Sequence, residues 1–122
     1  MIAAGFGFRQ GAAIDSLRDA YDRARAGRAA RLLASAEDKV EAAVFLELAQ
    51  ALELPIRAVP ASELAAQDTV TRSPRVRAER GTGSLAEAAA LAAAGPGARL
   101  LGPRAISSDR MASCALAEGS IP

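Results

Sequence analysis

The sequence predicts an α/β fold: one three-layer α/β/α domain whose mixed, mostly parallel sheet has about five strands and ends in an antiparallel hairpin. Short apolar segments alternate with longer segments of helical spacing, which is typical of strands joined by crossover helices. The last two apolar segments lie too close together for such a helix. The length of 122 residues and the hydrophobic content of 51% suit a single domain over residues 1–122.

The first strand and the first helix are predicted over residues 2–8 and 12–26. Residues 2–8 are mainly apolar and contain Gly5 and Gly7. In residues 12–26 apolar side chains recur at helical spacing, so one face of the helix packs on the sheet. These side chains are Ile14, Leu17, Tyr21 and Ala24. Gly27 follows as a C-cap.

A second strand, a second helix and a third strand are predicted over residues 30–35, 35–52 and 56–59. The helix has one apolar face, formed by Val40, Val44, Leu48 and Leu52. Pro55 ends it, because proline cannot continue a helix.

The next segment contains two helices separated by a basic stretch. Ser62 is the expected N-cap of a short helix that ends at Ala66. Residues 68–83 are rich in arginine and contain proline and glycine, so we expect them to be irregular. Ser84 and Glu87 then have the spacing of a capping box at the start of an alanine-rich helix.

The last two strands are predicted over residues 99–101 and 111–116. The segment between them is short and polar, so it cannot hold a crossover helix. We therefore expect these two strands to be antiparallel.

Composition excludes several classes of function. The net charge of +1 argues against nucleic-acid binding, which needs a strongly basic face. The chain has no histidine and a single cysteine, Cys114, which excludes a Ser-His-Asp triad, a histidine-ligated metal and a thiolate zinc site. No signal peptide or membrane span is recognisable, so we expect a cytoplasmic protein without membrane contact. No cofactor motif is present.

A glycine-rich turn follows the first strand. Residues 5–11 read GFGFRQG and stand between a strand and a helix, where α/β folds place ligands and where backbone N–H groups can hold an anion. The spacing matches neither the dinucleotide fingerprint nor the P-loop. The alternative is a tight turn that needs glycine only for its backbone angles.

The order of these motifs resembles the cobalamin-biosynthesis family that comprises CobE and the C-terminal domain of CbiG. That family opens with a glycine pattern that this chain matches at Gly5, Gly7, Phe8, Arg9 and Gly11. Phe8 stands where members often have cysteine, so no thiol chemistry carries over to it. The resemblance extends from about residue 5 to about residue 116. The chain is similar to the single-domain CobE form.

Three further segments carry the resemblance. The first is SAEDKVEAA, which supplies Lys39 and Glu41, and the second is LPIRAVPASELAA. The third supplies Ser73, Val76, Gly83, Ser84 and Glu87.

The resemblance implies a site for a precorrin, a flat macrocycle rimmed with carboxylates. Arginine forms bidentate hydrogen bonds with carboxylates, and an apolar floor suits the ring. The residues expected to bind the substrate are Gly5, Gly7, Phe8, Arg9, Gly11, Ser73, Arg75, Gly83 and Ser84. Further cations that could contribute are Lys39, Arg72 and Arg77.

The resemblance also implies an enzymatic activity. CbiG-type proteins open a ring lactone of cobalt-precorrin-5A and release a two-carbon aldehyde. Without histidine, a carboxylate such as Glu41 or Glu87 would act as the base, and Lys39 or Arg9 would stabilise the oxyanion. The alternatives are a non-catalytic carrier of the macrocycle, a subunit whose partner supplies the chemistry and, last, a nucleotide-binding domain. Each candidate also has a plainer interpretation: Glu87 as a capping residue and the arginines of residues 72–80 as a solvated loop.

Overall fold

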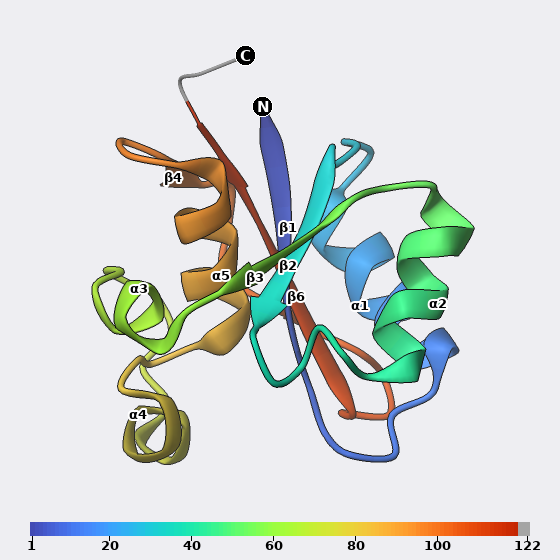
Figure 1. Ribbon diagram of the computed structural model, residues 1–122, viewed down its shortest axis with the longest axis horizontal. Helices are drawn as coiled ribbons and strands as arrows, with labels where there is room; N and C mark the ends of the chain where they lie inside the picture. The colour runs from blue at the N-terminus through green and yellow to red at the C-terminus, as the bar shows by residue number, and fades with distance from the viewer. Residues whose placement is uncertain (120–122) are drawn as a thin grey trace.

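The computed structural model describes residues 1–119 and shows a single sheet between two layers of helices (Figure 1). Its elements follow in the order β1 (Ile2–Phe8), α1 (Ile14–Arg25), β2 (Leu32–Ala36), α2 (Ala43–Leu52), β3 (Ile56–Val59), α3 (Ala61–Ala65), α4 (Pro74–Arg80), α5 (Leu85–Ala94), β4 (Arg99–Leu100), β5 (Ala105–Ile106) and β6 (Ala112–Glu118). No helix in this part of the chain is long and apolar enough to span a membrane.

The sheet is mixed, as the sequence predicts. Within residues 1–119 it has six strands in the order β3-β2-β1-β6-β4, and β5 also pairs with β6. β2 is parallel to β1 and to β3, whereas β6 is antiparallel to β1, β4 and β5. The antiparallel C-terminal end is thereby confirmed. β5 was not expected, because it lies in the short polar segment between the last two predicted strands.

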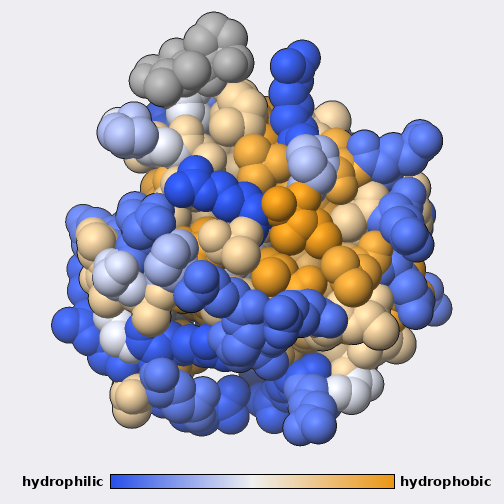
Figure 2. Space-filling view, in the orientation of Figure 1, coloured by the Kyte–Doolittle hydropathy of each residue, from blue (hydrophilic) through white to orange (hydrophobic). Residues whose placement is uncertain are grey.

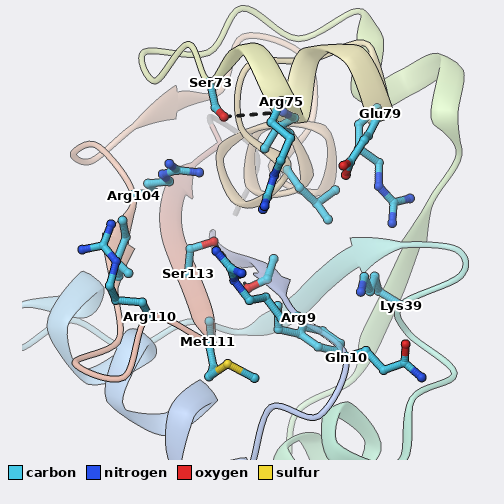
Figure 3. A pocket seen from close by; sticks show the side chains of 17 residues that line it. Arg9, Gln10, Lys39, Ser73, Arg75, Glu79, Arg104, Arg110, Met111 and Ser113 are labelled. Atoms are coloured by element: carbon cyan, nitrogen blue, oxygen red, sulfur yellow. Dashed lines mark hydrogen bonds between the residues drawn. The ribbon is translucent and has the colours of Figure 1, made fainter.

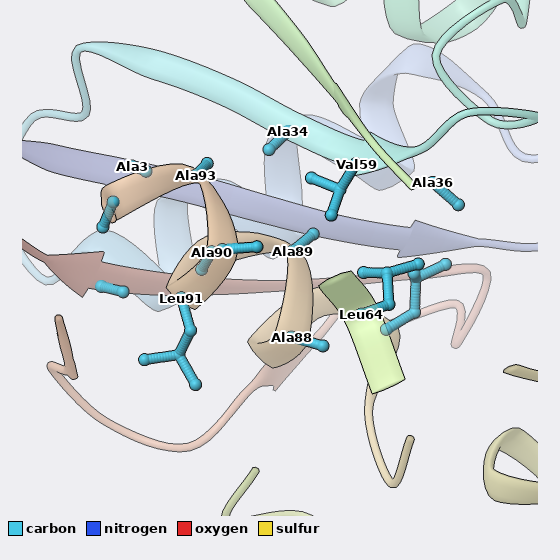
Figure 4. Packing of buried hydrophobic residues seen from close by; sticks show 14 residues of the cluster. Ala3, Ala34, Ala36, Val59, Leu64, Ala88, Ala89, Ala90, Leu91 and Ala93 are labelled. Carbon is cyan, nitrogen blue, oxygen red and sulfur yellow. The ribbon is translucent and has the colours of Figure 1, made fainter. Parts of the chain in front are cut away.

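Each face of the sheet has its own core. α1 and α2 cover one face over large side chains, among them Phe6, Leu33 and Phe45. α5 covers the other face almost entirely with alanines (Figure 4). Small side chains let α5 lie so close to β1 that a Cβ on Gly5 would come within 2.1 Å of the Ala86 carbonyl oxygen. Gly5 therefore serves this close packing.

α2 begins later than the helical pattern predicts. β2 continues to Ala36, whose carbonyl accepts hydrogen bonds from the backbone N–H groups of Lys39 and Val40. These bonds form a turn over residues 37–42, and the helix starts at Ala43. The prediction of a helix from residue 35 is therefore wrong up to residue 42, and Lys39 and Glu41 lie in the turn.

Residues 68–83 are not wholly irregular, since α4 forms within them. The Ser73 hydroxyl accepts a hydrogen bond from the Val76 N–H, Pro74 occupies the first turn, and Gly81 ends the helix with a left-handed φ of 73°. A serine N-cap, an N-terminal proline and a C-terminal glycine are the ordinary signals of a helix. The high arginine content obscured them. α3 also begins at Ala61, one residue before the expected cap position.

Candidate functional site: a cationic cleft at the end of β1

A cleft of about 670 Å³ lies at the carboxyl end of β1 (Figure 3). The antiparallel pairing sets Phe8 opposite Ala112, so the end of β1 meets the beginning of β6. The Arg9 N–H donates to the Met111 carbonyl oxygen at 2.9 Å and holds the two segments together. α4, the turn containing Lys39 and the segment before β5 complete the walls. Among the described residues, six separate parts of the chain, including Leu85 of α5, thus converge on one cavity.

The side chains that line the cleft are predominantly cationic. Six cations stand against one carboxylate, that of Glu79. The cations are Arg9, Lys39, Arg75, Arg80, Arg104 and Arg110. Figure 3 shows Arg75 pointing from α4 towards Arg9, with Arg104 and Arg110 together on one side. The hydrophilic lower part of Figure 2 is the same end of the molecule.

Only one of these cations forms an ion pair within residues 1–119. Arg80 donates to both carboxylate oxygens of Asp38, at 2.6 and 2.8 Å. The hydrogen bonds from Arg80 are the main cause that lowers the pKa of Asp38. The other five cations of the cleft have no acidic partner among the described residues. Their charge is therefore available to an anionic ligand.

An aromatic ring forms part of the apolar surface of the cleft. Phe8 stacks on Phe45 with ring centroids 5.8 Å apart and planes 17° from parallel. The ammonium of Lys39 lies 5.0 Å from the centre of the Phe8 ring, which is cation–π distance. Further apolar side chains of the cleft are Val76, Leu85, Ile106 and Met111. This arrangement provides an apolar surface with cations around it.

Arg110 is presented by a tightly bonded turn. The hydroxyls of Ser107 and Ser16 donate to the Asp109 carboxylate, at 2.6 and 2.5 Å, and the Met111 N–H donates to it at 3.1 Å. These hydrogen bonds, that of Ser107 foremost, lower the pKa of Asp109. Arg110 itself has a left-handed φ of 62°. Asp109 thus anchors the turn to α1 and fixes the backbone from which Arg110 projects.

The structure brings half of the predicted site residues together. Those that line the cleft are Gly7, Phe8, Arg9, Lys39, Ser73 and Arg75. Gly11 lines a smaller adjoining cavity of about 250 Å³, which shares Phe8, Arg9 and Lys39 with the cleft.

The remaining predicted residues lie elsewhere. Gly5 packs against α5, and Gly83 approaches the Thr71 carbonyl so closely that a Cβ would lie 2.3 Å from that oxygen. Ser84 caps α5 by accepting a hydrogen bond from the Glu87 N–H. Glu41 is exposed on its turn, and Glu87 is fully buried. Of the three residues predicted to be catalytic, Lys39 alone lines the cleft.

Sequence reasoning did not select Glu79, Arg80, Arg104, Arg110 or Met111 as site residues. Arg104, Arg110 and Met111 reach the cleft only because the last strand pairs with the first, a contact between residues over 100 positions apart. The glycine-rich turn locates one wall, and no local pattern shows which distant segment forms the opposite wall. Within residues 1–119 no cluster of three or more histidine, cysteine or acidic side chains has the arrangement of a metal site.

The fold and the cleft define a small α/β domain with a cationic cleft at the carboxyl end of β1. The family model described as cobalamin synthesis G C-terminus matches residues 2–117, and the chain belongs to that family. It is thus a cobalamin biosynthesis protein of the CobE and CbiG C-terminal type. No significant match occurs among curated proteins.

Solved structures agree with this assignment. CobE, a protein from the cobalamin (vitamin B12) biosynthetic pathway, is 35% identical with a TM-score of 0.83, over 96% of this chain and 89% of that one. The cobalamin biosynthesis protein chiG from Agrobacterium tumefaciens is 35% identical with a TM-score of 0.75, over 98% and 99% of the two chains. A homologue of cobalamin biosynthesis protein G from Sulfolobus solfataricus shares the fold at 20% identity and a TM-score of 0.64, over 95% of this chain and 36% of that one.

Proposed function

We propose that the cleft binds a precorrin intermediate by its peripheral carboxylates and holds it without converting it. The observation that carries this proposal is that five of the cleft cations have no acidic partner within residues 1–119 and share the cleft with Phe8. Guanidinium groups form bidentate, charge-assisted hydrogen bonds with carboxylates. A macrocycle lying against Phe8 would direct its acetate and propionate arms towards Arg9, Arg75 and Arg110.

The apolar side chains support a flat ligand in particular. Phe8 is held in place by its stacking on Phe45, so its ring is a fixed surface. Ile106 and Met111 add apolar contacts on the β6 side of the cleft. A small dicarboxylate would use the cations and leave this apolar surface unoccupied, whereas a macrocycle would cover both.

The geometry favours binding over lactone hydrolysis. Hydrolysis requires a carboxylate beside the substrate to activate water, because the chain has no histidine. Glu41 and Glu87 do not line the cleft, and Glu79 on α4 is the one carboxylate of the described residues that does. Lys39 is the residue best placed to stabilise an oxyanion if conversion occurs. Catalysis therefore remains the second candidate, to be decided by assay.

The test is a titration of the protein with a stable corrin polycarboxylic acid and with its fully methyl-esterified form, followed by absorption spectroscopy. We expect the acid to bind at one equivalent and the ester to bind at least about tenfold more weakly, because each ester removes a charge-assisted hydrogen bond. Equal affinity for acid and ester would show that the cations do not recognise the ligand.

Variants locate the site and separate binding from conversion. Arg9→Gln should weaken binding of the acid about fivefold, the effect of one partly exposed ion pair. Arg18→Gln is the matched control, since Arg18 is exposed on α1 outside the cleft. A precorrin lactone incubated with the protein should give no aldehyde. Aldehyde release that Lys39→Ala abolishes would establish the hydrolase instead.

A further inference from the structure

Glu87 is an acidic residue in an otherwise apolar helix. All ten residues of α5 are buried, and the other nine are alanine or leucine. The Glu87 side chain is 0% exposed. Burying a carboxyl group is unfavourable unless hydrogen bonds replace those it makes to water. The hydrogen-bond partners of the Glu87 carboxylate therefore show what a buried glutamate contributes to the structure.

The two oxygens of Glu87 bond to two different segments. Oε1 accepts a hydrogen bond from the Thr71 N–H at 2.8 Å. Oε2 accepts one from the Arg104 N–H at 2.9 Å, and also one from the Thr71 hydroxyl. Two backbone donors from segments far apart in sequence thus meet on one buried side chain.

Both segments continue directly into walls of the cleft. Thr71 stands two residues before Ser73, the N-cap of α4, which contributes Arg75, Glu79 and Arg80. Arg104 has its own side chain in the cleft. α4 has no fully buried residue and packs on the core only through the partly buried Val76, so attachments of its entry segment contribute to its position. Glu87 itself does not line the cleft.

We propose that Glu87 is a positioning residue that holds Arg104 and the entry to α4 in the geometry that binds the anionic macrocycle. It acts through two backbone N–H groups and touches no ligand. The identity of the ligand in this inference rests on the proposed function. The positioning role of Glu87 rests on the hydrogen bonds alone.

Glu87→Gln tests it with almost no change in volume. A glutamine presents one acceptor and one NH2 group, so in either orientation the NH2 group faces a backbone N–H, that of Thr71 or that of Arg104. One of the two segments must then lose its attachment. Glu47→Gln is the control, because Glu47 is exposed on α2, away from the cleft.

The first measurement is hydrogen exchange of individual backbone amides. In Glu87→Gln we expect exchange at Thr71 or Arg104 to become about tenfold to a hundredfold faster, as for loss of a buried hydrogen bond. Amides of β1 and β2 should keep their protection, and Glu47→Gln should change neither group. Unchanged protection at both Thr71 and Arg104 would overturn the proposal.

The second measurement is a double-mutant cycle in the titration with the corrin polycarboxylic acid. If Glu87 acts by placing the Arg104 segment or α4, its effect on affinity should shrink in an Arg104→Gln or an Arg75→Gln background. It should persist in an Arg9→Gln background, since Arg9 lies on the opposite wall. Fully additive effects with both Arg104→Gln and Arg75→Gln would contradict the positioning role.

The two proposals fail in distinguishable ways. If Arg9→Gln and Arg104→Gln both leave affinity unchanged, the proposed ligand site is wrong, whatever Glu87 does. If the two arginine variants weaken binding but folded Glu87→Gln binds the acid with normal affinity, the proposed ligand site is supported and the positioning role is wrong. Circular dichroism of each variant at the titration temperature confirms that folded protein is being measured.

Discussion

Arg110 combines an unfavourable backbone conformation with a place in the cleft. Its φ of 62° lies in the left-handed region, which costs a residue with a Cβ about 1–2 kcal/mol. The hydrogen bonds to Asp109 hold the turn in this form. Glycine would relieve the strain, so the presence of arginine indicates that its side chain contributes something other than stability.

Arg110→Gly should therefore separate stability from binding. We expect the free energy of unfolding to stay the same or rise by up to about 1 kcal/mol, because glycine adopts this φ freely but loses more chain entropy. Affinity for the corrin polycarboxylic acid should fall about fivefold. Urea unfolding and titration measure the two quantities. A clear loss of stability would mean that the Arg110 side chain supports the turn itself.

At the scale of elements, the contact between β1 and α5 depends on Gly5. A Cβ there would lie 2.1 Å from the Ala86 carbonyl oxygen and 2.4 Å from the Ala90 backbone nitrogen. Backbone atoms in the middle of a helix cannot move aside singly, so the whole helix would have to shift.

We expect Gly5→Ala to lower the free energy of unfolding by about 3 kcal/mol, at the upper end for an overpacked core. Gly11→Ala is the comparison: Gly11 has a φ of 88° with nothing within 4 Å of an added Cβ. Its cost should be about 1 kcal/mol, from backbone strain alone. Denaturant unfolding of both variants checks this order. Similar costs would show that α5 adapts to a methyl group.

Within the part of the chain that the structure describes, α4 forms one ion pair across the cleft, that of Arg80 with Asp38. The pKa of Asp38 is lowered in the folded protein, chiefly by the hydrogen bonds from Arg80. The stabilisation is therefore complete above the ordinary pKa of 3.8 and is lost as the pH falls through the lower, folded value. The side chain of Asp38 is 62% exposed, so solvent screening keeps the contribution small.

Asp38→Asn should reproduce at neutral pH the effect of acid on wild-type α4. Tryptic cleavage after Arg75 and Arg77 should become several-fold faster in the variant, while the free energy of unfolding falls by less than about 1 kcal/mol. Between pH 5 and 8 the cleavage of wild-type protein should follow only the enzyme's own pH dependence. Unchanged cleavage in Asp38→Asn would show that Arg80 does not restrain α4.

Most of the elements that the sequence predicted contain a recognisable apolar segment. α1 has apolar residues at helical spacing, and β1 and α5 are almost continuously apolar, so their places follow from burial alone. α4 has no buried residue and its helical signal lies only in its caps, which explains why it was missed. The turn that carries Lys39 was mistaken for helix because Val40 continues the apolar spacing of α2. The site depends on both of these segments.

At the scale of the whole molecule, charge is distributed unevenly. The chain has a net charge of only +1, yet the lining of the cleft contains six cations and one carboxylate. Many arginines outside the cleft are neutralised locally, as in the pairs of Arg23 with Asp19 and Arg99 with Glu118. Net charge is a property of the whole chain, so it did not reveal this strongly positive cleft.

The concentration of positive charge in the cleft predicts how the affinity for the ligand responds to the salt concentration. The cleft cations are partly solvated, so raising the salt concentration from about 0.05 M to about 0.5 M should weaken binding of the corrin polycarboxylic acid by about tenfold or more. The methyl ester, which offers only its apolar ring, should bind equally at both concentrations or slightly better at the higher one. Isothermal titration at a series of salt concentrations measures both ligands. If the affinity of the acid were independent of salt, contact with Phe8 and its apolar neighbours would dominate recognition, and the arginines would set only the orientation of the ring.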